Sequence, residues 1–213
     1  MKTDQLIDVL STNLDPVDPH EVMRNVGIAI ICGLAVALAS GIFVLGLRLD
    51  FQGANALGFL LLKLIFGAAI VVLGSIFLIR HVRPGGEFRS WTALAGVPFL
   101  GALALAGMNL MSAPASHWDD MLLGGKWLEC LISIPIIAVL PFAIIMFAVR
   151  LAAPTNLVRT GALAGLVAGG VSAIAYALHC TDDSLPFVAL WYGGTVGLCT
   201  AAGALLGPRL LRW

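Results

Sequence analysis

The chain has 213 residues, of which 60% are hydrophobic and only 11% are charged. Soluble domains carry about 25% charged residues, so this composition excludes an ordinary soluble domain. The basic and acidic residues balance to a net charge of zero, which gives no indication of direct nucleic-acid binding. The apolar residues fall in runs of about 20, the length that crosses about 30 Å of hydrocarbon. The sequence therefore predicts an integral membrane protein that is surrounded by lipids.

The first 23 residues are polar and acidic, and they lack the basic start and early apolar core of a secretory signal. Apolar residues at spacings of three and four predict a short amphipathic helix over residues 4–13, with a stripe formed by Leu6, Val9, Leu10 and Leu14 and with Ile7 at its flank. This arm is too short to form a core. Its stripe lies either on the bilayer surface or in the groove of a protein partner, and its acidic charge favours the partner.

Six membrane spans are predicted after a second helix start at residues 18–21 that runs directly into the first span. They lie at about 26–47, 58–79, 91–112, 130–152, 161–178 and 187–207. The chain thus divides into an arm (1–23) and a membrane domain (24–213). The expected fold class is an all-α membrane protein, a six-transmembrane-helix bundle with a short N-terminal cytoplasmic amphipathic helix.

Small residues and prolines indicate how the spans pack. Glycines recur at four-residue spacing in the last two spans, at Gly161, Gly165 and Gly169 and in the pairs Gly193–Gly197 and Gly203–Gly207. Such spacing lets helices approach closely in membranes. Two prolines in the fourth span, Pro135 and Pro141, are expected to bend it.

Basic residues set the expected orientation. If the N-terminus is cytoplasmic, nine basic residues face the cytoplasm and only Arg48 and Lys126 face outward, so both termini are expected inside. Lys63 lies within the second span, where it could belong to an ion path. No acidic partner occurs within any span, which favours the alternative that its amine reaches up to the outer interface.

The stretch from Tyr176 to Tyr192 is expected to be a tight polar cap between the last two spans. Cys180 lies in this cap, and Cys130 begins the fourth span on the same outer side, where disulfides are permitted. A thiol switch, a metal site that includes His179, and no special role all remain open. The spacing matches no standard zinc pattern. Cys32 and Cys199 lie within spans as small apolar residues.

Four features stand out along the chain: the opening Met-Lys-Thr-Asp-Gln-Leu-Ile-Asp-Val-Leu, the six short-looped spans, Trp-Leu-Glu-Cys-Leu around Cys130, and His-Cys-Thr-Asp-Asp-Ser-Leu-Pro-Phe-Val-Ala-Leu-Trp-Tyr from His179. Over essentially the whole chain they resemble the NrsF family of membrane anti-sigma factors. The resemblance implies a multi-pass protein of the bacterial inner membrane whose cytoplasmic arm holds an extracytoplasmic-function sigma factor inactive.

The resemblance also assigns roles to individual residues. It implies that Cys130 and Cys180 face the periplasm and are needed to respond to heavy-metal or oxidative stress. The arm residues expected to bind the sigma factor are Asp4, Leu6, Ile7, Val9 and Leu10. No enzymatic activity is expected, and no cofactor beyond transient heavy-metal binding at Cys130, Cys180 and His179.

Two other classes of protein compete with this interpretation. A quinone-linked thiol oxidoreductase usually carries a Cys-x-x-Cys pair, and the chain has none. A small transporter is indicated only by Lys63 and by the two prolines of the fourth span. Binding of a sigma factor by residues 1–23 would separate regulation from both alternatives.

Overall fold

The structure, a computed structural model, describes residues 20–48, 54–82 and 92–212. These residues are helical without a β-strand, and six of their segments are long and apolar enough to cross a membrane. The segments are Glu21–Leu45, Ala56–Val82, Leu94–Ser112, Ala115–Arg150, Leu157–Ala177 and Leu185–Leu210. The prediction of six helices of membrane-spanning length is confirmed. Their ends differ by several residues from the apolar runs because a helix can continue beyond the hydrocarbon.

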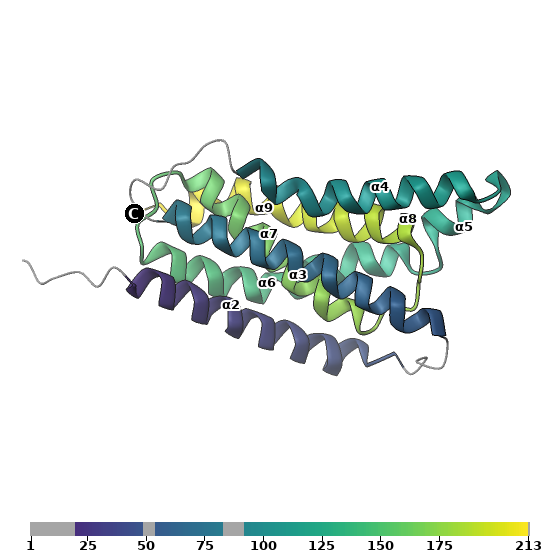
Figure 1. The fold of residues 1–213 in the computed structure, drawn as a ribbon. Coiled ribbons are helices and arrows are strands. Elements are labelled where there is room, and N and C mark those ends of the chain that lie inside the picture. The colour runs from purple at the N-terminus through teal and green to yellow at the C-terminus, as the bar shows by residue number, and fades with distance from the viewer. Residues whose placement is uncertain (1–19, 49–53, 83–91, 213) are drawn as a thin grey trace, which may run out of the picture.

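Long helices alternate with short connecting turns along the chain. They are α2 (Glu21–Ser40), continued by a π-helical turn (Gly41–Leu45), α3 (Ala54–Val82), α4 (Val97–Ser112), α5 (Trp118–Leu123), α6 (Trp127–Arg150), α7 (Leu157–Ala177), α8 (Leu185–Phe187), a second π-helical turn (Val188–Tyr192) and α9 (Gly193–Leu210). The start of α2 and the end of α9 lie at one end of the bundle, here called the terminal end (Figure 1). Residues 46–48, 113–126 and 178–184 lie at the opposite cap end.

Local sequence explains several helix boundaries. The side chain of Asn156 begins α7 by accepting a hydrogen bond from the backbone N–H of Arg159 at 3.1 Å. Gly124 ends α5 with φ +58° and ψ −175°, a conformation that is essentially restricted to glycine. The two prolines of the fourth span, Pro135 and Pro141, both lie inside the uninterrupted helix α6.

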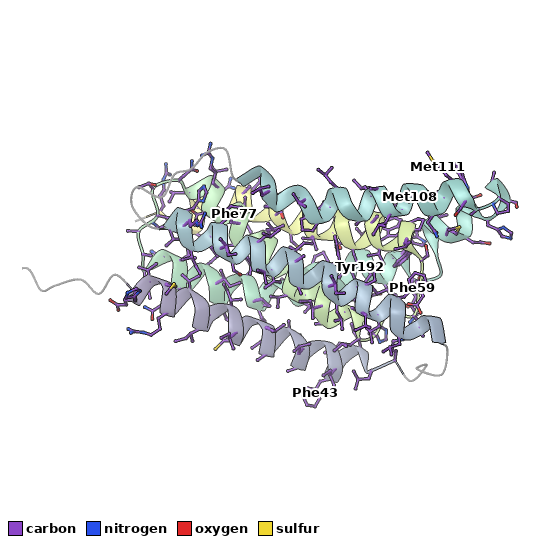
Figure 2. All side chains as sticks on the ribbon, in the orientation of Figure 1. Phe43, Phe59, Phe77, Met108, Met111 and Tyr192 are labelled. Atoms are coloured by element: carbon purple, nitrogen blue, oxygen red, sulfur yellow. The ribbon has the colours of Figure 1, made fainter. Side chains whose placement is uncertain are left out.

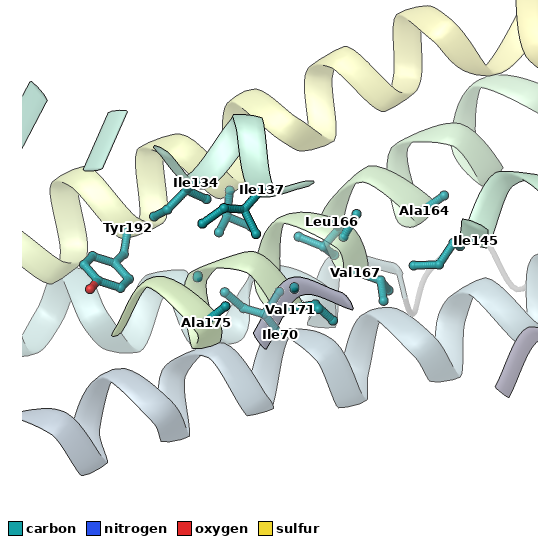
Figure 3. Packing of buried hydrophobic residues seen from close by; sticks show 14 of the residues in the cluster. Ile70, Ile134, Ile137, Ile145, Ala164, Leu166, Val167, Val171, Ala175 and Tyr192 are labelled. Carbon is teal, nitrogen blue, oxygen red and sulfur yellow. The ribbon is translucent and has the colours of Figure 1, made fainter. Parts of the chain in front are cut away.

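Helix α7 forms the centre of the bundle. It packs against α9, α3, α6 and α2, and 72% of its most apolar stretch is buried, against 6% for the α4 segment at the edge. Figure 3 shows Ile70 of α3, Ile134 of α6 and Val171 of α7 within one apolar cluster. The small residues of α7 leave room for these larger neighbours.

The contact between α7 and α9 is made by glycines. A Cβ added to Gly161 would overlap the carbonyl oxygen of Gly203, and one added to Gly165 would overlap that of Cys199. The predicted close packing is therefore confirmed for these glycines and for Gly203. It is wrong for Gly197, where an added Cβ would meet no heavy atom within 4 Å.

The outer surface of the bundle is apolar, as a membrane requires. Phe43 and Met111 project away from the helices and are each 88% exposed, whereas Tyr192 lies inside (Figure 2). Because these large side chains have no protein to cover them, their favourable environment is lipid hydrocarbon.

Charge is distributed unequally between the two ends. The arginines of the described helices gather at the terminal end, where they are Arg24, Arg80, Arg150, Arg159, Arg209 and Arg212. Arg48 and Lys126 lie at the cap end. The bias counted along the sequence is thus retained in three dimensions, and it is the asymmetry that the positive-inside rule uses.

The sigma-binding residues proposed for the arm, which are Asp4, Leu6, Ile7, Val9 and Leu10, lie outside the described residues. Asp18, in the helix start predicted at residues 18–21, does too. The helix expected to start beside it begins at Glu21 and continues directly into the first span, as predicted. Residues 21–23, assigned from the sequence to the arm, form the first turn of α2.

Candidate functional site at the cap end

The cap is the loop of residues 178–184 between α7 and α8. Two contacts join it to the end of the first span: the backbone N–H of Arg48 donates to the carbonyl of Leu178 at 2.9 Å, and Nδ1 of His179 lies 3.2 Å from the carbonyl oxygen of Gly46. The prediction of a tight polar cap joining two spans is confirmed. These contacts also show that the cap is held by residues 46–48, which follow the first span and are far away in sequence.

An ion cluster joins the cap to Arg48, which follows the first span, and to Lys63 of α3. The guanidinium of Arg48 donates to both carboxylate oxygens of Asp183, at 3.1 and 2.9 Å, and Nζ of Lys63 donates to one of them at 3.0 Å. The side chains of Arg48 and Lys63 are 1% and 0% exposed, and that of Asp183 is 19% exposed. One carboxylate therefore binds two cations, Arg48 just beyond the first span and Lys63 in α3.

The protonation of Asp183 follows from these contacts. Burial alone would raise the pKa of its carboxyl group, but hydrogen bonds from Arg48 and Lys63 outweigh burial and hold the pKa below its ordinary value. Asp183 is thus ionised at neutral pH. The expectation that Lys63 has no acidic partner within a span is literally correct, because its partner lies just beyond the end of α7.

The second acid of the cap makes a different contact. Asp182 accepts a hydrogen bond from the backbone N–H of Lys126 at 2.7 Å and a longer one from Gly125 at 3.4 Å. These groups lie at the start of α6, where the helix dipole favours a negative charge. The two adjacent acids therefore bind different parts of the bundle. Asp182 binds the start of α6, and Asp183 binds Arg48 after the first span and Lys63 in α3.

Further contacts join the cap to the segment that contains α5. The hydroxyl of Ser184 donates to the carbonyl of Met121 at 2.6 Å, and the indole N–H of Trp191 donates to that of Leu122 at 2.8 Å. The ring of Trp191 also lies 5.1 Å from that of Trp127. The cap is consequently attached on every side, which fixes the position of its cysteine.

The two predicted sensor cysteines lie together beneath this polar layer. Cys130 and Cys180 are both free thiols with no exposed surface, and both belong to the apolar cluster that contains Tyr176 and Tyr192. They lie within electrostatic range of one another and of Lys63. The fold thus brings into one cluster two thiols that are 50 positions apart in sequence.

Tyr176 and Tyr192 lie in the same buried cluster as the two thiols. Their rings lie 5.8 Å apart, and the ring of Tyr192 also lies 5.9 Å from Nζ of Lys63. The hydroxyls of Tyr176 and Tyr192 are buried and complete no hydrogen bond, although that of Tyr192 lies beside the Cys180 thiol. A buried hydroxyl without a hydrogen bond raises the free energy of the folded state. A rearrangement that gave either hydroxyl a polar partner would therefore be stabilised.

The third predicted metal ligand, His179, is directed to the carbonyl oxygen of Gly46. The described residues include no group of three or more His, Cys, Asp or Glu side chains placed to hold a metal ion. Cys130, Cys180 and His179 are therefore not assembled as a three-ligand site, and metal binding there stays a prediction.

The ion cluster was not predicted as a site. The sequence indicates Arg48 only as an outward-facing charge and favours Lys63 as a lysine whose amine reaches the interface. A useful signal was present in the sequence: Lys63 is the one ionisable residue deep in a span, and Asp183 is the second of two adjacent acids at the end of another. Pairing them requires knowing that α3 and α7 are neighbours.

The fold and the cap define the class of the protein: a multi-pass helical membrane protein that gathers two of its four thiols and a buried ion cluster at one end. The NrsF family, described as negative regulator of sigma F, matches residues 10–213. A probable anti-sigma-F factor NrsF of Azospira oryzae is 32% identical over 214 residues, and the anti-sigma-F factor NrsF of Caulobacter vibrioides is 32% identical over 222 residues; in both cases 100% of each chain is covered. No solved structure matches this chain. The chain belongs to the NrsF family of negative regulators of sigma F.

Proposed function

We propose that this protein is a membrane anti-sigma factor that sequesters an extracytoplasmic-function sigma factor and releases it when Cys130 and Cys180 react with an oxidant or a heavy metal. The observation that carries the proposal is membership of the NrsF family over nearly the whole chain. Its relatives are regulators, which agrees with a protein that is not an enzyme.

The proposed sigma-binding part is the arm, through Asp4, Leu6, Ile7, Val9 and Leu10. An amphipathic helix of this kind can lie in an apolar groove of a partner. Two observations support a cytoplasmic arm: the arginines gather at the terminal end, and α2 begins there at Glu21, so that the last three residues assigned to the arm form its first turn. A movement of α2 would therefore be passed to the arm without an intervening domain.

The proposed sensor is the thiol pair. With hydrogen peroxide as oxidant, both thiols lose a proton and the pair gives up two electrons, a sulfur–sulfur bond forms, and the hydrogen peroxide is reduced to two waters. A soft divalent metal would instead displace the thiol protons and bind both sulfurs. The disulfide requires the two Cα atoms to come within about 7 Å. The location of both thiols in one buried cluster supports either chemistry.

The required energy is modest. Changing the sigma factor from mostly bound to mostly free takes about 3–5 kcal/mol of differential stability. A disulfide contributes about 2–4 kcal/mol and a bound metal can contribute more. One reaction at the thiol pair is therefore sufficient if its product fits the released state better than the resting state.

The arm is tested with the full-length protein in lipid nanodiscs and the purified sigma factor. Leu6→Asp and Leu10→Asp should each weaken binding at least tenfold, because a charge enters the apolar stripe. Gln5→Ala, between the stripe positions, is the matched control and should bind normally. Unchanged binding by both aspartate variants would overturn the role of the arm.

The sensor is tested with a sigma-dependent reporter in cells exposed to peroxide or cadmium. Cys130→Ser and Cys180→Ser should each leave the protein in the membrane with the reporter unresponsive. Cys32→Ala and Cys199→Ala are controls and should respond normally. If both serine variants respond like the wild type, the proposed sensor is wrong, whereas the arm could still bind the sigma factor.

A further inference from the structure

The cap is joined to the first span more directly than the helix packing alone would require. Within residues 46–48, the carbonyl of Gly46, the backbone N–H of Arg48 and the guanidinium of Arg48 all contact residues 178–183. Gly46 itself has φ +80°, which ends the preceding π-helical turn and directs the chain back over the cap. The end of the first span therefore rests on the loop that carries Cys180.

The peptide carbonyl of Cys180 is an acceptor in this contact. Nη1 of Arg48 donates to it at 3.1 Å, and Nζ of Lys63 donates to it at 3.2 Å. The same two cations bind Asp183 three residues later. Arg48 and Lys63 thus both bind two acceptors of the loop, which are the carboxylate of Asp183 and the peptide carbonyl of Cys180.

The charges of this cluster are unequal, with two cations to one carboxylate. Buried ion clusters contribute little to net stability because desolvation offsets their attraction, but they do fix geometry, since each donor needs its acceptor. Loss of either acceptor would leave both buried cations with fewer hydrogen bonds. The arrangement therefore tolerates only a narrow range of loop positions.

We propose that Arg48, Lys63 and Asp183 form a clamp that holds the Cys180 loop in the resting state, and that opening this clamp carries a reaction at Cys180 to α2. The inference rests on the proposed function and adds the positioning residues through which the sensor acts. When the sulfur of Cys180 forms a bond to Cys130 or to a metal, the residue must move. Its carbonyl moves with it, and Arg48 and Lys63 lose a shared acceptor.

The clamp gives a short route across the protein. Arg48 lies three residues beyond the π-helical turn that follows α2, and α2 extends from this turn back to Glu21, within the last residues assigned to the arm. Release of Arg48 frees the cap end of this helix. The reaction of the sulfur is thus transmitted through one helix rather than through the whole bundle.

Arg48→Lys is the central test because it keeps the charge but loses the fork that reaches both acceptors. In single-cysteine variants, the alkylation rate of Cys180 should rise at least tenfold with Arg48→Lys, while that of Cys199, half-buried in the middle of α9, should not change. In unstressed cells carrying all four cysteines, the reporter should rise toward its induced level. Glu129→Gln removes an exposed charge from the same end and should change neither measurement.

Asp183 provides a second, independent variant. Asp183→Asn should raise Cys180 alkylation and basal reporter activity, and Asp183→Glu should restore both toward wild type. A rise in Cys199 alkylation equal to that of Cys180 would show general unfolding and overturn the clamp. So would wild-type behaviour of Arg48→Lys and Asp183→Asn in cells where Cys180→Ser abolishes the response, a result that leaves the proposed sensor intact.

Discussion

Replacement of Asp183 by asparagine should cost more stability than any other single change of charge at the cap. The carboxylate accepts three charge-assisted hydrogen bonds, two from Arg48 and one from Lys63. Asparagine is nearly isosteric but neutral, so it leaves two buried cations without a counter-charge. Removing one partner of a buried pair costs about 3–5 kcal/mol.

The lower part of this range applies here. The side chain of Asp183 is 19% exposed, so water reaches one side of the carboxylate and partly screens the cations. We expect a loss of about 3 kcal/mol, which is roughly a 150-fold change in the unfolding equilibrium. Lys63→Met should cost less, about 1 kcal/mol, because it leaves the neutral pair of Arg48 and Asp183 intact.

The assay is equilibrium unfolding of the purified protein in mixed micelles, with increasing dodecyl sulfate and circular dichroism as the signal. Glu129→Gln is the control, since the pair of Lys126 and Glu129 is partly exposed, and exposed pairs contribute less than about 1 kcal/mol. A loss in Asp183→Asn no larger than that in Glu129→Gln would refute the reasoning. A loss in Lys63→Met that equals it would show that the lysine, not the carboxylate, is the centre of the cluster.

Three further outcomes follow from the same geometry. The pKa of Asp183 is lowered in the folded state, so its contribution to stability is present above the ordinary carboxyl pKa and is lost as pH falls through the folded pKa. Unfolding curves measured over a pH series should show this loss of stability in acid, and the loss should be smaller in Asp183→Asn. Gly161→Ala should lower stability by about 2 kcal/mol in dodecyl sulfate unfolding, since its Cβ overlaps the backbone of α9, while Gly197→Ala should not. Gly124→Ala, at φ +58° and against Asp182, should cost about 1–3 kcal/mol in the same assay, and Gly125→Ala much less.

The spans and the polar cap were predictable because both depend on local pattern. Apolar runs of membrane length define the helices, and the change from Ala177 to the acids at 182 and 183 defines the cap. Glycine spacing predicted the contact of α7 and α9, but it could not separate Gly203, which meets Gly161, from Gly197, which faces outward. Spacing gives the face of a helix and not the identity of its neighbour.

The ion cluster could not be read from the sequence because its members come from three different parts of the chain. Arg48, Lys63 and Asp183 become neighbours only through the arrangement of α2, α3 and α7. The partner of Lys63 is a carboxylate that lies a few residues beyond the end of a span, so the sequences of the spans alone do not contain it. A lysine in a span can be neutralised from a neighbouring loop whenever its long side chain points toward the membrane surface.

The central position of α7 has a consequence for biogenesis. Its glycines are covered by α9, and Tyr192, which precedes α9, completes the surroundings of the two thiols. A nascent chain in which only five spans have entered the membrane therefore has neither the close helix contact nor the complete surroundings of the thiols. Under the proposed function, we expect a response only from copies in which the final span has joined its partners.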